Sequence, residues 1–204
     1  SKGAVADRKM LHNARLEAAW TLIPTLILIG MAIPSVEKLI KIEDTSGSEL
    51  TIKITGYQWQ WHYEYLGSGV SFFSRLARSS DLARQKGSGI DPASVENYLR
   101  DVDHPLVVPT GTKIRLLLTA NDVIHAWGVP DLGTKRDAIP GFIHEMWISV
   151  DEDKPGTYRG QCAELCGADH GFMPIVVIAK PKAEFEAWLR REREAGGTAL
   201  AQAE

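Results

Sequence analysis

The chain has 204 residues, of which 24% are charged, and its formal net charge is -3. This length is enough for one fair-sized domain with an appendage. Acidic and basic residues are nearly balanced, which does not favour nucleic acid as a partner.

The first predicted element is a membrane-spanning helix over 17–40. Residues 18–36, AAWTLIPTLILIGMAIPSV, contain no ionisable side chain. At about 1.5 Å per residue, this stretch nearly crosses a bilayer core of about 30 Å. A buried core helix or a signal peptide would also be apolar, but a signal peptide would be followed by a small-residue cleavage site rather than by PSVEKLIKIED. The segment contains two prolines, which spanning helices tolerate where neighbouring helices satisfy the freed carbonyls, so a partner bundle is expected.

The cations around this segment predict its orientation. More of them precede the span than follow it, and those that follow are diluted by nearby acids. The preceding cations are Lys2, Arg8, Lys9 and Arg15, and the following ones are Lys38 and Lys41. By the positive-inside bias, the flank 1–16 faces the cytoplasm and the chain from residue 41 onward is exported. The exported part then lies in an oxidising compartment, where a disulfide is a serious alternative for any cysteine pair.

The exported part, 41–190, is predicted to be mainly β. Short runs rich in β-branched or aromatic residues are separated by turn signals such as VPTG, IPG and KPG. These runs cover 50–55, 59–66, 113–119, 144–150, 157–161 and 175–180. Several short strands of this kind predict an antiparallel sandwich or barrel.

Two further segments depart from the strand pattern. Residues 67–97 are polar and end in a Gly/Ser-rich stretch, so they are expected to form a partly helical insertion on the surface of the sandwich. Near the C-terminus, PKAEFEAWLRREREAGG is typical of a terminal helix with Phe185, Trp188 and Leu189 as its apolar stripe. Residues 191–204 are expected to form a flexible tail.

Both cysteines lie in QCAELCGADHGFMP, residues 161–174. A disulfide between Cys162 and Cys166 is geometrically allowed, but it would close a very small loop and give no role to His170 and Met173. Zinc would accept two thiolates and two histidines, yet it has no use for a thioether. Thiolate, imidazole and thioether together are typical of copper. Because a mononuclear blue-copper site needs only one thiolate, the two cysteines could instead bridge a pair of coppers, each with its own histidine.

A second histidine ligand must come from elsewhere in the sandwich, and His125 is the best candidate. It follows the predicted strand 113–119 and stands among apolar neighbours in TANDVIHAWGVPDLG, a setting that can hold a neutral imidazole as a ligand. The other histidines lie on the far side of the membrane, before a proline in a polar turn, or beside polar neighbours in predicted strands. They are His12, His104, His62 and His144.

These residues together resemble subunit II of bacterial haem-copper cytochrome c oxidases of the type that carries a CuA centre, over about 12–188. The copper loop of that family, C-x-E-x-C-x3-H-x2-M, and its upstream D-V-[LI]-H-x-W are both present. The resemblance implies a transmembrane helix followed by a cupredoxin-like Greek-key β-sandwich with a short C-terminal helix. It also implies binuclear copper, with Cys162 and Cys166 as bridging ligands, His125 and His170 as terminal ligands, and Met173 and the backbone carbonyl of Glu164 as weak axial ligands.

In the family, copper accepts electrons from cytochrome c and passes them to haem a in subunit I, which reduces oxygen to water and pumps protons. The resemblance therefore implies cytochrome c, subunit I, other oxidase subunits and membrane lipid as partners. It also implies the bacterial inner membrane, with the C-terminal domain on the periplasmic side. The family usually has two spanning helices, and this chain begins at the approach to the second.

Four further roles follow from the resemblance. GYQWQWHYEY matches the family segment whose first tryptophan receives the electron from cytochrome c, so Trp59 is expected to have this role. Acids that meet the lysine ring of cytochrome c match at Glu64 and Asp122. Glu17 matches a glutamate at the mouth of a proton channel, and the Glu164 side chain matches one that holds magnesium shared with subunit I.

Three other classes of protein compete with this reading. A membrane-tethered copper-delivery protein of the thioredoxin-like kind also carries C-x3-C and a distant histidine, but it should alternate strands with helices, whereas the predicted strands here follow one another. A copper-free structural relative from a quinol oxidase lacks the ligands that this chain has. The copper domain of nitrous oxide reductase shares the loop but needs no membrane span.

Overall fold

The computed structural model describes residue 3 and residues 12–201. The remaining residues of the predicted flank 1–16 and of the predicted tail, namely 1–2, 4–11 and 202–204, lie outside the described residues. The chain forms two compact units, residues 1–42 and residues 43–204. The boundary between them falls close to residue 41, where the exported domain was predicted to begin.

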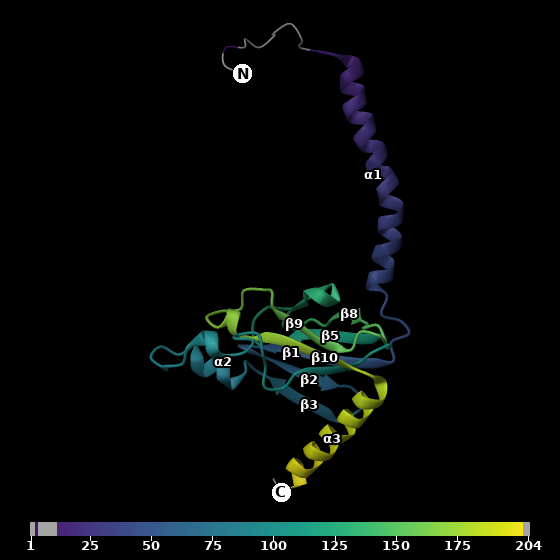
Figure 1. The fold of residues 1–204 in the computed structure, drawn as a ribbon. Helices are drawn as coiled ribbons and strands as arrows, with labels where there is room; N and C mark the ends of the chain where they lie inside the picture. The colour runs from purple at the N-terminus through teal and green to yellow at the C-terminus, as the bar shows by residue number, and fades with distance from the viewer. Residues whose placement is uncertain (1–2, 4–11, 202–204) are drawn as a thin grey trace. The chain divides into compact units, whose positions relative to one another are not determined.

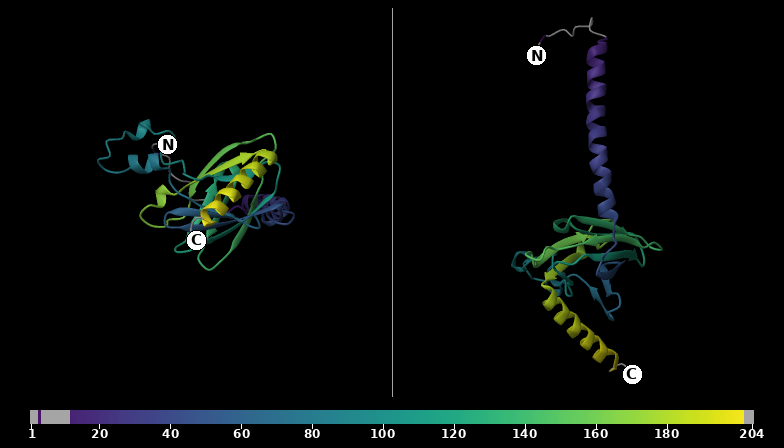
Figure 2. Two further views of the ribbon diagram at one scale, coloured as in Figure 1. Left: turned by 90° about the horizontal axis from the view of Figure 1, so that it is seen from below. Right: turned by 90° about the vertical axis from the view of Figure 1, so that its right-hand side faces the viewer.

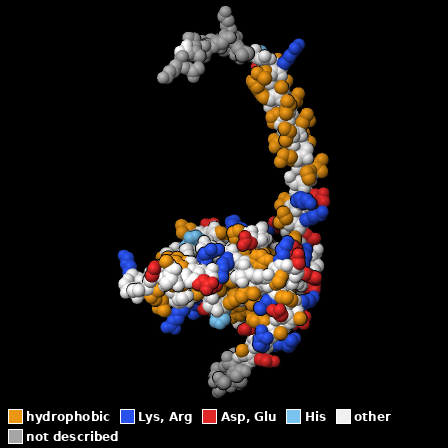
Figure 3. Space-filling view, viewed as in Figure 1, with side chains coloured by type: hydrophobic (Ala, Val, Ile, Leu, Met, Phe, Trp, Pro, Cys, Tyr) orange, Lys and Arg blue, Asp and Glu red, His pale blue; other side chains and the backbone are white. Residues whose placement is uncertain are grey.

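The first unit contains helix α1, Ala14–Glu43. The Asn13 side chain caps it by accepting a hydrogen bond from the Leu16 N–H at 3.2 Å, and Glu17 accepts one from the Asn13 N–H at 3.0 Å. No residue of α1 is buried, and hydrophobic side chains cover its middle (Figure 3). In the described part of the chain, α1 is the one helix long and apolar enough to cross a membrane, and it contains the predicted span 17–40.

The second unit is built on two five-stranded sheets (Figure 1). In spatial order, the first sheet contains β3 (Val70–Ser74), β2 (Gln60–Tyr65), β1 (Leu50–Tyr57), β5 (Ile114–Ala120) and β8 (His144–Ile148). The second contains β4 (Leu106–Pro109), β10 (Pro174–Lys180), β9 (Gly156–Cys162), β6 (His125–Val129) and β7 (Thr134–Ala138). Three 3-10 turns lie at Pro92–Ser94, Pro130–Leu132 and His170–Phe172.

The pairing of the strands differs in part from the antiparallel sandwich that the sequence predicted. All six predicted strands are present, but β1 pairs with β5 in parallel and β4 pairs with β10 in parallel. The other pairs are antiparallel. A parallel pair needs a crossover connection rather than a tight turn, so strands far apart in sequence become neighbours.

The core lies between the sheets and explains which residues the strands bury. In β5, Ile114, Leu116 and Leu118 are fully buried while the residues between them are partly exposed, which is the period of two expected for a strand with one face inward. Strand β6 is different, because all five of its residues are buried. Its sequence HAWGV therefore shows no alternation, which is why β6 was not predicted.

The predicted insertion at 67–97 begins too early. Residues 70–74 form strand β3, which pairs with β2 and buries Val70 and Ser74. The turn before it contains Gly67 and Gly69, both with positive φ, so the chain reverses there into a hairpin rather than leaving the sheet. The segment that does leave the sheet begins after β3 and contains helix α2, Arg78–Ala83, so the prediction of a partly helical segment was correct for that part (Figure 1).

Helix α3, Lys182–Ala201, is the yellow helix at the C-terminal end of the chain in Figure 2. It follows β10 and contacts β3 and β4. The predicted stripe packs as expected, since the ring centroids of Trp188 and Tyr65 are 5.3 Å apart and Phe185 is buried. The backbone is helical to Ala201, and the flexible tail over 191–204 stays a prediction. The Arg, Glu and Ala residues after 190 are good helix formers, and they outweigh the two glycines at 196 and 197.

Candidate metal centre

Two paired strands bring the first two candidate ligands together. His125 is the first residue of β6 and Cys162 is the last residue of β9. In the antiparallel ladder between these strands, Trp127 lies opposite Cys162, so His125 and Cys162 are two positions apart in register. The sheet itself therefore places an imidazole beside a thiol that is 37 residues away in sequence.

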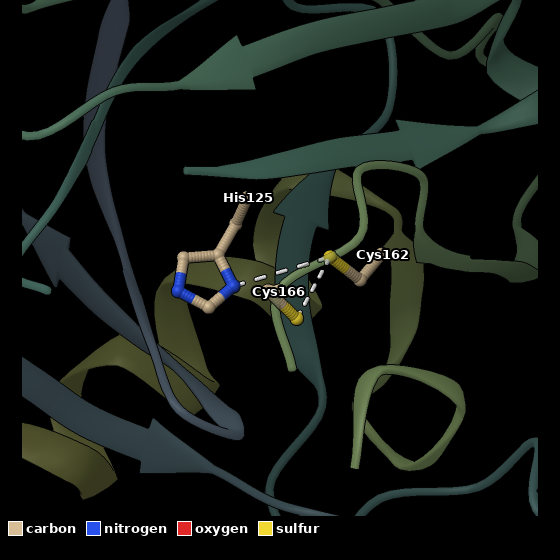
Figure 4. Close-up of side chains that lie close together, drawn as sticks. All are labelled: His125, Cys162 and Cys166. Atoms are coloured by element: carbon tan, nitrogen blue, oxygen red, sulfur yellow. Dashed lines mark hydrogen bonds between the residues drawn. The ribbon is translucent and has the colours of Figure 1, made fainter. Parts of the chain in front are cut away.

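The sulfur atoms of the two cysteines face each other and His125 (Figure 4). Cys162 Sγ lies 3.9 Å from Cys166 Sγ and 4.0 Å from His125 Nδ1. Both cysteines are free thiols, since a disulfide would need a sulfur separation of about 2.05 Å. The ligand atoms of these three buried residues all lie within 4.8 Å of one another. This is the arrangement of a metal site.

The copper loop adds a second group of donors around Cys166. Cys166 Sγ lies 3.5 Å from His170 Nδ1 and 3.5 Å from Met173 Sδ. On the other side of the pair, the backbone oxygen of Glu164 lies 3.3 Å from Cys162 Sγ. A histidine and a weaker donor therefore lie close to each sulfur, and all six predicted copper ligands lie in one cluster.

The donors fit copper. Bonds from a metal to thiolate sulfur and imidazole nitrogen are about 2.0–2.3 Å long, so two ligands of one metal lie about 3.5–4 Å apart, as these do. Soft sulfur donors with imidazole select copper over hard cations, and a thioether such as that of Met173 suits copper better than zinc. Met173 and both cysteines are almost completely buried, which keeps water away from the donors.

The His125 ring is fixed from three sides. Its Nε2 lies 2.9 Å from a carboxylate oxygen of Asp122, so the Nε2 proton is bound there and Nδ1 is left with its lone pair toward the sulfurs. The indole of Trp61 packs edge-on against the ring at 5.9 Å between centroids. On β1, Gly56 leaves room for the imidazole, since a Cβ at that position would lie 2.7 Å from His125 Cδ2.

The backbone carbonyl of Cys166 is held by the turn between β1 and β2. It accepts hydrogen bonds from Gln58 Nε2 at 2.9 Å and from Trp59 Nε1 at 3.2 Å. Trp59 is partly exposed, so its indole connects the molecular surface to a ligand residue through one hydrogen bond. The Asp122 carboxylate also accepts the Gln58 N–H at 2.7 Å, which ties this turn to the His125 side of the site.

The two thiols have unlike acidities in the metal-free chain. Burial alone would raise the pKa of Cys162, but hydrogen bonds with His125, His170 and the nearby backbone lower it below the usual value. Burial and the neighbouring Cys162 thiolate raise the pKa of Cys166. Burial would raise the pKa of Asp122, but its hydrogen bonds from His125 and the backbone lower it, so Asp122 is a carboxylate beside the imidazole. One thiolate and one carboxylate therefore flank His125.

The structure places Glu64, Glu17 and the Glu164 side chain outside this cluster. Glu64 lies on β2, where its carboxylate is 3.7 Å from Lys53 Nζ. Glu17 lies in the first turn of α1, where His12 Nδ1 is 2.8 Å from its carboxylate. The Glu164 side chain is exposed although its backbone oxygen faces Cys162. Asp122 was predicted to meet a partner protein, and its hydrogen bond to His125 is an additional role that the sequence did not indicate.

Four supporting residues were missed, and only one carried a usable signal. Gly56 interrupts an apolar strand, which often marks a close approach of another group. Gln58, Trp61 and Arg84 reach the site from segments about 60–110 positions away in sequence. Their side chains are common in sheets and on surfaces, so their spacing indicates nothing without the fold.

Comparison with known proteins agrees with this site. The family model "Cytochrome C oxidase subunit II, periplasmic domain" matches residues 50–180, and the transmembrane-domain model of the same family matches residues 1–38. The chain is 44% identical over 180 residues to cytochrome c oxidase subunit 2 of Lycodon semicarinatus, covering 88% of this chain and 74% of the relative. It is 43% identical over 189 residues to the probable subunit 2 of Rickettsia prowazekii, covering 93% of this chain and 57% of the relative.

A solved structure is similar as well. The periplasmic domain of subunit II of cytochrome oxidase from Bradyrhizobium japonicum superposes with a TM-score of 0.62 at 37% identity, covering 74% of this chain and 99% of that domain. The cupredoxin-like sandwich that the sequence predicted is confirmed by this match. One apolar helix followed by a periplasmic-type domain fits a protein of the inner membrane. The two family models together cover most of the chain, and it belongs to the cytochrome c oxidase subunit II family.

Proposed function

We propose that the chain is the electron-input subunit of a haem-copper cytochrome c oxidase and that its six donors hold a binuclear CuA centre. The observation that carries this proposal is the gathering of two histidines, one thioether and one backbone oxygen around a single pair of thiols. His125 and the Glu164 carbonyl lie next to Cys162 Sγ, and His170 and Met173 lie next to Cys166 Sγ. When bound, the copper pair would accept one electron at a time from cytochrome c and release it toward haem a of subunit I.

The residues of the chain serve this function by holding the donor atoms rigidly. Strand pairing, the Asp122 hydrogen bond and the Gln58 and Trp59 hydrogen bonds fix the donors, four of which are buried, before metal binds. Rigid donors change position little when charge changes, which favours fast transfer at a small driving force. Burial of the sulfurs also excludes water from the site.

The test is the metal content and spectrum of the full chain in detergent. Loaded with copper, it should bind two copper ions and show an electron paramagnetic resonance spectrum in which one unpaired electron is shared equally by two copper nuclei. Cys166→Ser should lose the shared spectrum, because one bridging sulfur is gone. One copper with a single-nucleus pattern in the unsubstituted chain would overturn the proposal and favour a copper carrier.

Trp59 is the residue through which cytochrome c delivers the electron. Its partly exposed indole and its hydrogen bond to the Cys166 carbonyl support this role. In the assembled oxidase, Trp59→Phe should slow electron delivery from cytochrome c while leaving the copper spectrum intact. Trp147, a partly exposed tryptophan on β8, provides the control, and Trp147→Phe should leave delivery unchanged.

Cytochrome c docks through surface acids that include Glu64 and Asp122. An acidic docking surface acts mainly on the association rate and weakens with salt. Two cations lie beside the residues of this surface. Lys53 Nζ is 3.7 Å from the Glu64 carboxylate, and Arg75 Nε donates to the Gln60 side chain next to Trp59 in sequence. Glu64→Gln should reduce the association rate at low salt and have little effect at high salt, whereas an equal effect at both would remove Glu64 from the docking surface.

The remaining assignments concern subunit I. The exposed carboxylate of Glu164 would contribute to a magnesium site shared with subunit I, and oxidase carrying Glu164→Gln should retain copper and lose magnesium.

Glu17 would lie at the mouth of a proton channel, and Glu17→Gln should slow proton uptake. Its hydrogen bond to the Asn13 N–H gives it a capping role as well, so helix content must be compared in the same variant.

A further inference from the structure

Arg84 connects the segment after β3 to the copper loop. It follows α2, and its Nε donates to Asp81 at 2.8 Å, which fixes the side chain relative to the helix. Its two terminal nitrogens donate to the two carboxylate oxygens of Asp169 at 3.2 and 3.4 Å. Its guanidinium also lies over the ring of Phe172, 4.4 Å from the centroid. One side chain therefore makes a two-pronged ion pair and a stacking contact on the same loop.

Both contacts of Arg84 lie next to copper ligands. Asp169 precedes His170, and Phe172 precedes Met173. These four residues belong to or adjoin the 3-10 turn His170–Phe172, which is only three residues long. A turn of this length has few hydrogen bonds of its own. The position of His170 and Met173 relative to Cys166 therefore depends on contacts from outside the turn, and Arg84 supplies two of them.

The segment that carries Arg84 is itself closed and anchored. We call residues 75–103 the brace. Its ends pair through the Ala77 N–H to the Asp101 carbonyl at 2.9 Å and the Asp103 N–H to the Arg75 carbonyl at 3.0 Å. Inside it, the fully buried hydroxyl of Ser80 accepts the Leu99 N–H at 3.0 Å.

Hydrogen bonds from Arg159 also join the brace to the strand that ends in Cys162. Arg159 on β9 donates from Nη1 to the Arg100 carbonyl at 2.7 Å and to Asp101 Oδ1 at 2.9 Å. Arg159 is three residues before Cys162, and Asp169 is three residues after Cys166. The brace is therefore attached on both sides of the stretch that contains the two cysteines.

We propose that Arg84 is a positioning residue for the copper site, and that the brace holds His170 and Met173 against Cys166 before metal binds. The guanidinium is suited to this because it is planar and permanently charged, and its fork matches a carboxylate while its face stacks on an aromatic ring. Arg84 and Asp169 are 23% and 33% exposed. An ion pair with this exposure contributes little to global stability. Its effect is local, on the mobility of the turn.

This inference rests on the proposed function only for its copper measurements, and its first test uses metal-free protein. In the full chain, amide hydrogen exchange over 168–173 should become about 10-fold faster in Arg84→Gln, because the turn opens locally when its support is removed. Exchange in β6 should not change. Arg84→Lys keeps the charge but loses the forked guanidinium and most of the stacking. Its exchange rate over 168–173 should therefore lie between those of the unsubstituted chain and Arg84→Gln. Arg78→Gln removes an exposed cation from α2, the helix that Arg84 follows, and should match the unsubstituted chain.

A double-mutant cycle separates a specific contact from a general disturbance. Asp169→Asn should accelerate exchange, and the double variant should be no faster than Arg84→Gln alone, because Arg84→Gln already removes the contact with Asp169. Additive effects would overturn the proposal. Should Arg84→Gln fail to fold, Phe172→Leu removes only the stacking surface and should still accelerate exchange over 168–173.

The copper-loaded chain provides the functional test. Release of copper to a chelator should be about 10-fold faster in Arg84→Gln than in Arg78→Gln, within the range of 10–100-fold that outer contacts of a metal site typically contribute. The copper hyperfine pattern should also become less symmetric. If the unsubstituted chain gives the shared-electron spectrum but Arg84→Gln changes neither exchange nor copper release, the positioning role of Arg84 is wrong and the proposed function stands. If Arg84→Gln accelerates exchange but the unsubstituted chain gives no binuclear spectrum, the positioning role stands and the proposed function is wrong.

Discussion

The two halves of the metal site are supported in different ways. The His125 half is part of the sandwich: the histidine begins a buried strand, its ring packs between Gly56 and Trp61, and Asp122 binds its outer nitrogen. The His170 half is a partly exposed surface turn that depends on contacts made by Arg84. Similar donor sets can therefore be held either by a sheet or by a braced loop, and the sheet-held half should tolerate change less.

Truncating the two histidines should give the largest contrast. His125→Ala leaves a hole in a fully buried position and removes the partner of Asp122, so we expect a loss of about 2–5 kcal/mol in the free energy of unfolding. His170→Ala, at a partly exposed position, should lose about 1 kcal/mol or less. Urea unfolding of the metal-free chain measures both, and equal losses would contradict the comparison.

Adding one methyl group to each half of the site should test the same comparison between the two halves. In Gly56→Ala, the new Cβ would lie 2.7 Å from His125 Cδ2, so the ring or the strand must move, and we expect a loss of about 1–3 kcal/mol. In Gly171→Ala, no atom lies within 4 Å of the new Cβ, and we expect a change of about 0.5 kcal/mol or less. Thermal unfolding gives the stabilities, and only Gly56→Ala should alter the copper spectrum.

Removing one charge beside His125 should have a smaller effect. Asp122→Asn keeps the shape of the side chain but no longer selects the tautomer with its free lone pair at Nδ1. We expect copper affinity to fall by about 10–100-fold, as is typical when the outer partner of a metal-bound histidine is lost. Competition with a chelator measures the affinity. Asp131→Asn, an exposed acid in the turn after β6, provides the control and should leave it unchanged.

The smallest predicted effect is a pH dependence of the metal-free chain. Because the folded-state pKa of Cys162 is lowered, this thiolate adds stability that is complete above the unfolded pKa of about 8.5 and is lost as pH falls through the lowered value. Ultraviolet absorbance should show one thiolate forming below the usual pH range and the other above it. In Cys162→Ser the early step should disappear, and its persistence would assign it to Cys166 instead.

The sequence could indicate most of the candidate donors because their pattern is local. Five of the six lie within 162–173, where the spacing of two thiols, an imidazole and a thioether limits the chemistry directly. His125 was found because it stands among apolar residues after a strand. The strand that carries it was not predicted, because a strand buried on both faces has no alternation and HAWGV is too short to be distinguished from a loop.

The supports of the donors were not predictable for a physical reason. Gln58 and Cys166 are 108 positions apart, and Arg84 and Asp169 are 85 apart. Parallel pairing and crossovers decide which distant segments meet, and neither leaves a local pattern. The predicted start of the insertion was wrong for the same reason, because VSFFS forms a strand by pairing with β2 and has no strong strand pattern of its own.

The hydrogen bond from Trp59 to the Cys166 carbonyl also determines when the site can form during synthesis. The two residues are 107 positions apart, and a ribosome adding about 5–20 residues per second needs about 5–20 s to make the second after the first. Through that interval the β1–β2 hairpin has no copper loop to bind. The site therefore cannot be completed until the copper loop has been made, which comes after every strand of the first sheet, and a factor that delivers metal to all six donors can act only after that point.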